Sequence, residues 1–321
     1  MAHFKNDEYK NVVRAGVIGH AVGDALGVPV ESMSREEIKA DPVREMTGFG
    51  THYVPEGSWS DNTSMEIALM QSVVDCKSFS YRDVMEKFCS WCQHDEFTAT
   101  GHLVRISGAC AKALNNYGHH GLNPTECGGK DEYNDSNDSL MRILPVAFAC
   151  DLRGYTGKDR YDLVRSVSSL TNAHPICIMG CHIYVNFICH LLSGKSIMEA
   201  YAAIQADDYS QYDPEVQKHY ARILKVNIAR LDASQIVSDD HIVHMLEATL
   251  WCLLNTMSYE EAVLKAVNLG EDTDTAGAVT GSMAGIAYGY DAIPERWISK
   301  LQRLEDLLIL CDNFTETLLD N

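Results

Sequence analysis

Two short clusters of oxygen-bearing side chains are the residues whose types and spacing most clearly suggest chemistry. The segment Ser60-Asp61-Asn62-Thr63 precedes one apolar, periodic stretch, and Asp272-Thr273-Asp274-Thr275 precedes another. Both stretches are predicted as helices, so both clusters are predicted at helix N-termini. Capping explains one such cluster, because Ser, Asp, Asn and Thr are the usual N-cap residues. Capping explains the presence of both clusters less well, because a cap needs one side-chain oxygen and each segment offers three or more.

The acidic members of these clusters predict a metal site. Carboxylates that are brought together repel one another unless a cation lies between them. Ligand sets made only of oxygen favour hard ions such as Mg²⁺ or Mn²⁺. Glu31 is a third candidate, because it follows a helix that Gly27 and Pro29 interrupt, so its carboxylate can reach a cleft away from the helix axis. These residues alone predict a hydrolase site with one or two metal ions.

The elements that must position these residues are helices. Apolar residues recur at spacings of three and four along several segments, which is the period of a helix, and no alternating strand pattern stands out. We therefore predict an all-α fold. A capping box formed by Ser258 and Glu261 starts a further helix, which Asn268 and Gly270 end. The periodic segments are 12–27, 63–76, 81–91, 176–192, 244–254 and 276–288.

The first and last of these segments carry stripes of glycine. Because a glycine inside a helix costs up to about 1 kcal/mol relative to alanine, a repeated stripe needs a reason. One interpretation is close helix packing without a functional role. The other is that the two backbones approach closely to bring their ends to a shared site. The stripes are Gly16, Gly19, Gly23 and Gly27 in the first segment and Gly277, Gly281, Gly285 and Gly289 in the last.

The interval from residue 115 to 139 is polar and glycine-rich, and a loop of that length in a compact helical protein is usually functional or mobile. Composition is alike on its two sides, and the sequence has no linker-like tract and no repeat of fixed period. We therefore predict a single domain over residues 1–321.

Charge and cysteine content exclude some classes of function. Lys and Arg total 26 against 45 Asp and Glu, a net charge of −19, which repels phosphate backbones and anionic lipids. We therefore expect no nucleic-acid partner and no membrane partner. The charge-free stretch 175–192 contains His182, Asn186 and His190, so we predict a buried helix there. The 11 cysteines have no framework spacing and no signal-peptide pattern precedes them, which indicates reduced thiols and a cytoplasmic location.

Five motifs resemble, in order, those of the ADP-ribosylglycohydrolase family, over a span from about Arg14 to Leu310. The resemblance implies a compact, single-domain, orthogonal helical bundle with a dinuclear Mg²⁺ or Mn²⁺ centre. It also implies removal of ADP-ribose from modified protein side chains, with arginine as the expected acceptor. The motifs are Gly23-Asp24-Ala25-Leu26-Gly27 with Glu31, Gly57-Ser58-Trp59-Ser60-Asp61-Asn62-Thr63, Ser139-Leu140-Met141-Arg142, Leu170-Thr171 with His174-Pro175, and Val267-Asn268-Leu269-Gly270-Glu271-Asp272-Thr273-Asp274-Thr275.

The resemblance also implies roles for single residues. Glu31 corresponds to the acidic residue beside the metals, and Glu31 or Asp61 is the expected general base toward a water molecule. Two metal ions would hold the ribose hydroxyls and this water, and they would let an acidic protein bind a diphosphate. The implied metal ligands are Ser60, Asp61, Asn62, Asp272, Asp274 and Thr275. The implied substrate-binding residues are Asn137, Asp138, Ser139, Met141 and His174.

Four positions depart from the family pattern. Asn62 and Asn172 stand where the family has Asp and commonly His, and Arg105-Ile106-Ser107 stands where Asp-Ile-Gly is expected. Glu271 replaces a usual Gly. Asn62, Arg105 and Asn172 support an alternative to the hydrolase: a catalytically weak protein that binds ADP-ribose or acts as a regulatory partner. A third reading is a metal hydrolase acting on another ribosyl or phosphoester compound.

Overall fold

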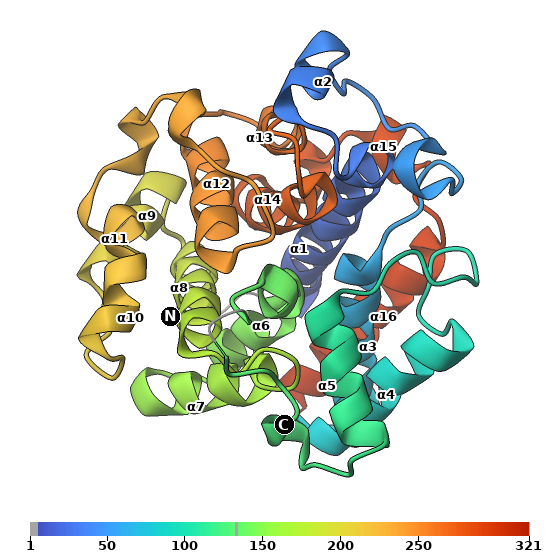
Figure 1. Ribbon diagram of the computed structural model, residues 1–321, viewed down its shortest axis with the longest axis vertical. Helices are drawn as coiled ribbons and strands as arrows, with labels where there is room; N and C mark the ends of the chain where they lie inside the picture. Colours follow the sequence, from blue (N-terminus) through green and yellow to red (C-terminus); the bar gives the residue numbers. More distant parts are fainter. Residues whose placement is uncertain (1–5, 132–133, 321) are drawn as a thin grey trace.

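The structure is a computed structural model that describes residues 6–131 and 134–320, and helices make up most of it (Figure 1). Short 3₁₀ helices lie between the α-helices, and the β-structure of the described residues is limited to isolated bridges. The predicted all-α class is therefore confirmed. The α-helices are α1 (Asn6–Gly27), α2 (Arg35–Ala40), α3 (Asp61–Cys76), α4 (Tyr81–His94), α5 (Gly108–Gly118), α6 (Leu144–Leu152), α7 (Gly157–Ser168), α8 (Pro175–Leu192), α9 (Ile197–Ala206), α10 (Pro214–His219), α11 (Ala221–Lys225), α12 (Ile242–Leu254), α13 (Tyr259–Val267), α14 (Thr273–Tyr288), α15 (Glu295–Ile298) and α16 (Leu304–Leu319).

The predicted helices all form, with two differences in detail around them. Only half of the capping box at α13 exists: Ser258 Oγ accepts the Glu261 N–H at 3.2 Å, but the Glu261 carboxylate accepts the N–H of Met257 instead. The segment 115–139 is not a loop throughout, because α5 continues to Gly118 and the 3₁₀ helix η4 (Asn137–Arg142) takes up its end.

The glycine stripes explain the closest helix contact of the fold. α1 packs most extensively against α14. A Cβ on Gly23 would lie 2.0 Å from the Gly277 carbonyl oxygen, and one on Gly27 would lie 2.4 Å from Asp274 Cα. Real Cβ atoms do not approach other atoms so closely, so only glycine permits this packing. Gly289 is the exception to the predicted stripe, since it ends α14 with φ +88° and no atom lies within 4 Å of its Cβ position.

The direction of these two helices brings the acidic segments together. α1 and α14 run in opposite directions, because Gly19 faces Gly281 while Gly27 faces Asp274. The C-terminal end of α1 therefore lies at the N-terminal end of α14. The close packing and the shared site, which sequence alone left as alternatives, occur together at this helix pair.

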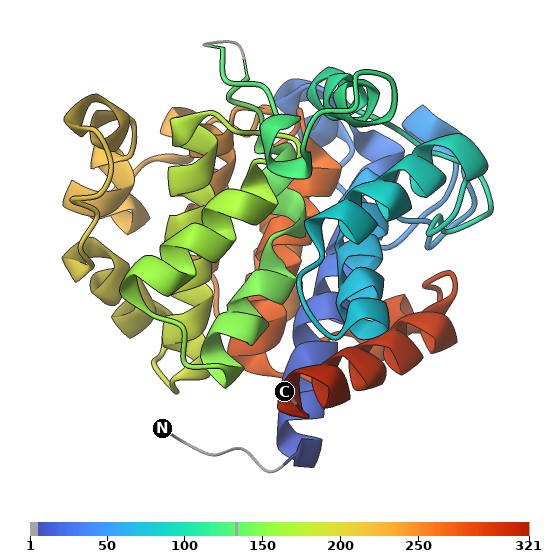
Figure 2. The ribbon, with the colours of Figure 1, turned by 90° about the horizontal axis from the view of Figure 1, so that it is seen from below.

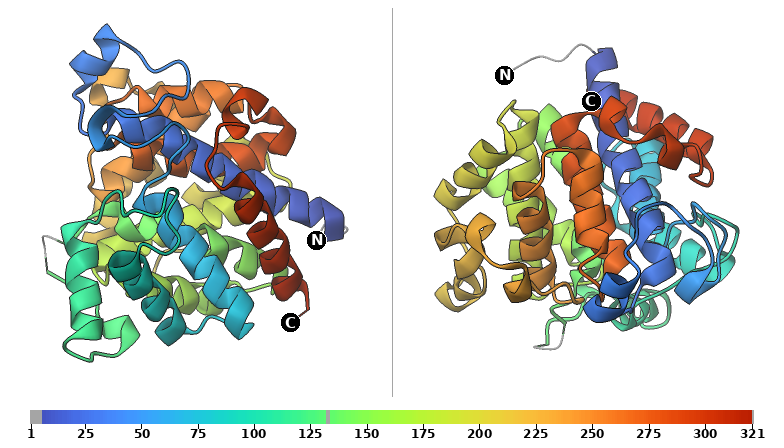
Figure 3. Two further views of the ribbon diagram at one scale, coloured as in Figure 1. Left: turned by 90° about the vertical axis from the view of Figure 1, so that its right-hand side faces the viewer. Right: turned by 90° about the horizontal axis from the view of Figure 1, so that it is seen from above.

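The start of α1 and the end of α16 lie together at the other end of the molecule (Figure 2). Lys10 and Arg14 of α1 pair there with Glu316 and Asp312 of α16, at 2.6 Å each. Figure 3 shows α2 and the loop that follows it at the opposite end of α1, where the acidic segments lie. The length of α1 thus separates the site from the two ends of the described chain.

The hydrophobic core is one cluster to which nearly all the long helices contribute. Among the described residues, one helix, α8, has the length and apolar composition that a membrane-spanning helix needs. Of its residues, 89% are buried inside the molecule, so α8 is a core helix, as predicted. The described cysteines are all free thiols, and most of them are buried.

Candidate metal centre

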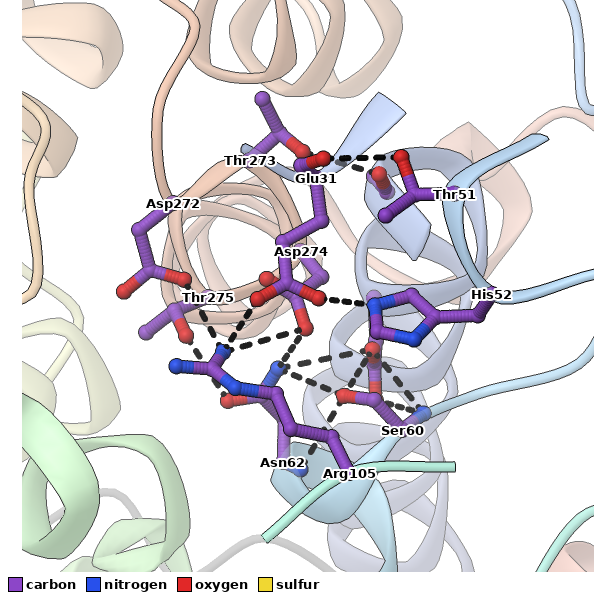
Figure 4. A network of polar contacts seen from close by, with 12 residues as sticks. Glu31, Thr51, His52, Ser60, Asn62, Arg105, Asp272, Thr273, Asp274 and Thr275 are labelled. Atoms are coloured by element: carbon purple, nitrogen blue, oxygen red, sulfur yellow. Dashed lines mark hydrogen bonds and ion pairs between the residues drawn. The ribbon is translucent and has the colours of Figure 1, made fainter. Parts of the chain in front are cut away.

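Three carboxylates converge where α1, α14 and the loop after α1 meet (Figure 4). Glu31, Asp272 and Asp274 each place an oxygen within 4.8 Å of the other two, and all three residues are buried. Among the His, Cys, Asp and Glu side chains of the described residues, these three are the set that lies close enough together to hold a metal ion. Asp272 and Asp274, which sequence placed together at one helix start, thus share a site with Glu31.

The chain holds Glu31 in place by ending α1 abruptly. α1 stops at Gly27, the 3₁₀ helix η1 (Val28–Val30) follows with Pro29 in its first turn, and Glu31 is the next residue. Backbone hydrogen bonds of 2.8 Å, from Ser32 N–H to the Glu271 carbonyl and from Glu271 N–H to the Met33 carbonyl, tie this loop to the start of α14. Glu31 therefore leaves the helix axis toward the acidic segment, as predicted.

The start of α14 leaves one oxygen of each of its two carboxylates without a hydrogen bond. Asp272 is the N-cap residue, but its side chain makes no capping hydrogen bond. Its Oδ2 accepts a hydrogen bond of 2.6 Å from Asn137 Nδ2, while its Oδ1 and Asp274 Oδ1 have no hydrogen-bond partner. Thr273 instead secures the helix start by donating its hydroxyl to the Gly27 carbonyl at 2.8 Å.

The start of α3 is held by Asp24 of α1. Asp24 accepts hydrogen bonds from the hydroxyls of Ser60 and Thr63 at 2.8 and 2.6 Å and from both of their backbone N–H groups. Ser60 Oγ also caps α3 by accepting the Asn62 N–H. Burial raises the pKa of Asp24 to about 6, although these hydrogen bonds oppose the shift. Asp24 is a scaffold residue that positions the predicted metal ligands.

Asn62 joins the two helix starts. Its Nδ2 donates to Asp274 Oδ2 at 3.2 Å and to Ser60 Oγ at 2.8 Å, and its Oδ1 accepts the Thr275 hydroxyl at 3.1 Å. The predicted ligands Ser60, Asn62, Asp274 and Thr275 are therefore in one hydrogen-bonded network. A carboxylate at position 62 would face Asp274 at this distance, so a cation between them would be needed.

Asp61, the first residue of α3, lies close enough to this region for its charge to interact with those of Arg105 and Glu31. It is 2% exposed, and its Oδ1 has no hydrogen-bond partner. Burial raises the pKa of Asp61 to about 7, with Arg105 lowering it and the charges of Asp138, Asp24 and Glu31 raising it further. Burial also raises the pKa of Asp274 well above its usual range, and the charges of Asp272 and Glu31 add to this shift.

A cationic side chain enters the centre from the segment between α4 and α5. Arg105 Nη1 lies 2.7 Å from Glu31 Oε1, 3.5 Å from Asp272 Oδ1 and 3.9 Å from Asp274 Oδ2. Burial lowers the pKa of Arg105, but the surrounding carboxylates raise it by more, so the guanidinium is charged. His52, in the 3₁₀ helix η2 (Gly50–His52), contacts the other Glu31 oxygen through Nε2.

The structure places only part of the predicted substrate-binding set at this centre. Asn137 contacts Asp272, and Asp138 lies close enough for its charge to act on Asp61. Ser139 and Met141 are buried in the core, and the Ser139 hydroxyl is already paired with Ser168 and Cys181. His174 caps α8 by accepting the Ile176 N–H at Nδ1. The roles of these five residues toward a substrate stay predictions.

Sequence reasoning did not assign a site role to Asp24, His52 or Arg105. The signal for Asp24 was present, because it lies in the quoted segment Gly23-Asp24-Ala25-Leu26-Gly27, one residue from the glycine that touches α14. Arg105 was visible only as a departure from the family pattern. His52 carries no local signal, since its approach to Glu31 depends on how the loop 48–54 folds back onto η1.

The residues present fit a hard divalent cation. The donors of the acidic group Glu31, Asp272 and Asp274 are all oxygens, which Mg²⁺ and Mn²⁺ prefer. Three buried carboxylate oxygens, Oδ1 of Asp61, Asp272 and Asp274, lack hydrogen-bond partners. A buried polar atom without a partner is costly, and a bound cation would remove that cost. Glu31, Asp272 and Asp274 would hold such an ion, with Asp61 beside them.

Comparison with known proteins identifies the family of this chain. The sequence model of the ADP-ribosylglycohydrolase family matches residues 5–320. An ADP-ribosylarginine hydrolase, Tri1, of Serratia proteamaculans is 27% identical over 302 residues, which cover 93% of this chain and 77% of that protein. The ADP-ribosyl-[dinitrogen reductase] glycohydrolase of Rhodospirillum rubrum is 28% identical over 286 residues, covering 88% of both chains.

Comparison of structures gives the same result. A solved chain described as an ADP-ribosylglycohydrolase-related protein complex superposes with a TM-score of 0.80 at 28% identity, covering 96% of this chain and 98% of that one. The fold is therefore shared along nearly the whole length, and the acidic helix starts lie within the matched region. This chain belongs to the ADP-ribosylglycohydrolase family.

Proposed function

We propose that the protein is a divalent-metal-dependent hydrolase that removes ADP-ribose from modified protein side chains, with arginine as the acceptor. The observation that carries the proposal is the set of buried carboxylate oxygens without hydrogen-bond partners where α1, α3 and α14 meet, in a chain of this family. The arginine acceptor is supported by the similarity to the Serratia relative, which is named an ADP-ribosylarginine hydrolase. The substrate partner is thus an ADP-ribosylated protein, in a reducing compartment such as the cytoplasm that suits the free thiols.

The centre is proposed to take two Mg²⁺ or Mn²⁺ ions. When bound, such ions supply Lewis-acid stabilisation and orient the ribose hydroxyls and a water molecule. Glu31, Asp272 and Asp274 would hold one ion, and Asp61, with the oxygens of Ser60, Asn62 and Thr275, would complete the donor set. Asn137 orients Asp272 by donating to its Oδ2.

Asp61 is the better placed of the two predicted bases. Both oxygens of Glu31 are engaged, one by Arg105 and the other by His52. Asp61 Oδ1 has no partner, so it can accept a proton from a water molecule that attacks the anomeric carbon. Glu31 would then serve as a ligand of the metal centre and not as the base.

The test is release of ADP-ribose from an arginine-modified protein in Mg²⁺, Mn²⁺ or chelator. We compare the wild type with Asp61→Asn and Asn62→Asp. The expected result is release by the wild type that chelator stops, at least about a hundredfold less release by Asp61→Asn, and retained release by Asn62→Asp. Release that chelator does not affect, or no release by the wild type and Asn62→Asp alike, contradicts the proposal.

Two observations favour a second candidate, an ADP-ribose-binding protein with weak activity. The amide of Asn62 takes a position that suits a carboxylate ligand, and Arg105 occupies part of the acidic centre. Calorimetric titration with ADP-ribose beside the release assay separates the candidates. Binding without turnover supports the binder, whereas turnover supports the hydrolase.

A further inference from the structure

Arg105 lies inside the group of oxygens that would hold a metal ion. Its Nη1 is within ion-pair distance of all three members of the acidic group, Glu31, Asp272 and Asp274, at 2.7 to 3.9 Å (Figure 4). Among the Lys and Arg residues that the structure describes, no other forms an ion pair with these carboxylates. The guanidinium is therefore the cation that balances them.

The guanidinium and a fully coordinated ion cannot share this space. An ion held by the same three carboxylates would lie about 2.0 to 2.6 Å from their oxygens. Nη1 lies 2.7 Å from one of those oxygens, so the two positive centres would be only a few ångströms apart. Two cations so close in a buried site repel strongly. One of them must move for the other to bind fully.

The charges of the centre point the same way. Glu31, Asp61, Asp272 and Asp274 carry four negative charges when ionised, which two divalent ions balance. Arg105 supplies one positive charge, so two divalent ions bound with the guanidinium in place would leave the centre with a net charge of +1.

The attachment of Arg105 allows it to leave. Its side chain is 27% exposed, whereas those of the carboxylates it contacts are at most 7% exposed. It comes from the segment between α4 and α5, which has no helix until Ser107 caps α5. The other arginine beside the site region, Arg142, is by contrast fully buried and bound to the Asp138 and Val167 carbonyls.

We propose that Arg105 is a built-in cation that competes with one of the two divalent ions. The centre takes one ion tightly, and it takes the ion that Glu31, Asp272 and Asp274 would hold only when the guanidinium withdraws. This inference rests on the proposed function for the presence of a metal centre. It adds that Arg105 sets the metal stoichiometry of this chain.

The test is titration of the full chain with Mn²⁺, followed by calorimetry and by electron paramagnetic resonance of free Mn²⁺. The proteins are the wild type, Arg105→Gln, Arg105→Lys and the control Arg14→Gln. Arg14 pairs with Asp312 at the other end of α1, so its removal changes net charge equally without touching the centre. We expect Arg105→Gln to bind the second ion at least about tenfold more tightly, and Arg105→Lys and Arg14→Gln to resemble the wild type.

The thermal stability of the metal-free protein tests the proposal independently of the binding titration. In chelator, Arg105→Gln is expected to unfold at a lower temperature than the wild type, because the carboxylates lose their counter-charge. It is also expected to gain more on addition of Mn²⁺. Neither readout depends on activity, and a folded Arg105→Lys protein checks that the position tolerates change.

The outcomes separate this inference from the proposed function. Equal ion numbers and equal affinities in the wild type and Arg105→Gln overturn it, even if the wild type releases ADP-ribose. A gain of the second ion in Arg105→Gln supports it, even if no variant releases ADP-ribose. Failure of every variant to bind Mn²⁺ overturns the competition and the metal-dependent function together.

Discussion

The helix starts of α3 and α14 carry similar residues but have different neighbours. At α3, the hydroxyls and N–H groups of Ser60 and Thr63 are paired with Asp24. At α14, Asp272 caps nothing, and one oxygen each of Asp272 and Asp274 has no hydrogen-bond partner. At the start of α3, the hydrogen bonds of Ser60 and Thr63 are satisfied, and Asp61 Oδ1 has no hydrogen-bond partner. The start of α14 concentrates negative charge, and Arg105 is the Lys or Arg residue of the described chain that forms ion pairs with it.

The difference originates in what α1 presents to each start. α1 offers Asp24, an acceptor, to the donors of α3, and it ends so that Glu31, a like charge, faces the acids of α14. The same type of motif is therefore structural at one place and available for a ligand at the other. A motif of N-capping residues becomes a metal-site candidate only when its neighbours fail to satisfy it.

The largest expected effect tests the structural side of this comparison. Asp24→Ala removes the acceptor of the backbone N–H and hydroxyl groups of Ser60 and Thr63. Because each buried donor left without a partner costs about 1–3 kcal/mol, we expect a loss of at least about 3 kcal/mol in the free energy of unfolding. Chemical denaturation in chelator measures it.

The matched control removes an aspartate that pairs only on the surface. Asp162→Ala breaks the exposed pair with Lys158 and is expected to cost less than about 0.5 kcal/mol. A loss at Asp24→Ala no larger than that of the control would show that the start of α3 is not held by Asp24.

A pH dependence of metal-free stability distinguishes the unpaired acid at α3 from ordinary surface carboxylates. The pKa of Asp61 is about 7 in the folded protein, raised chiefly by burial, against about 3.9 in an unfolded chain. The folded state therefore keeps a proton that the unfolded state has lost, and stability falls as pH rises toward about 7. From pH 5.5 to 7.5 this contribution amounts to about 2 kcal/mol.

The slope is measured by denaturation in chelator at several pH values. The same titration of Asp61→Asn isolates the contribution of Asp61 from that of the buried histidines, whose lowered pKa values act in the opposite direction below about pH 6.5. The two proteins should differ by a term that grows with pH. Parallel curves would mean that Asp61 ionises freely in the folded protein.

Asp274→Asn tests the start of α14 in the opposite direction. Removing this charge relieves repulsion with Asp272 and Glu31, so we expect the metal-free protein to gain about 1–2 kcal/mol of stability. The remaining carbonyl oxygen can still accept from Asn62. The gain should accompany loss of the stabilisation that Mn²⁺ gives the wild type. A variant that is destabilised and still responds to Mn²⁺ would contradict the assignment of Asp274 as a ligand.

Much of the fold could be predicted because its strongest signals are local. Apolar periodicity identified the helices that contain the acidic segments, and the glycine stripes identified the pair that packs backbone to backbone. The segment 115–139 was harder to interpret, because α5 ends in polar residues whose helical state depends on packing against α4. Composition describes such a segment as a loop whether or not it is one.

The site could be predicted only as far as its residues lie in motifs. Glu31, Asp61, Asp272 and Asp274 could be found because helix starts and helix breaks mark them. The contacts of Arg105 and His52 with Glu31 could not be, since they join segments far apart in sequence through side chains that no local pattern constrains. The burial of Ser139 and Met141 was missed for the same reason: a motif gives the order of residues but not the face that they present.

The smallest expected effect concerns the loop that ties Glu31 to α14. Glu271 has φ +62°, a left-handed conformation that costs a side chain free energy and that glycine adopts readily. Its side chain is exposed, while its N–H and carbonyl bind Met33 and Ser32. Glu271→Gly should therefore raise the free energy of unfolding by about 0.5–1 kcal/mol. Denaturation in chelator measures this gain, with Gly270→Ala as the opposite control, because Gly270 has φ +86° and a Cβ there would lie 2.7 Å from Arg35 N. A loss of stability in Glu271→Gly would mean that the carboxylate of Glu271, and not its backbone alone, helps to hold the loop that carries Glu31.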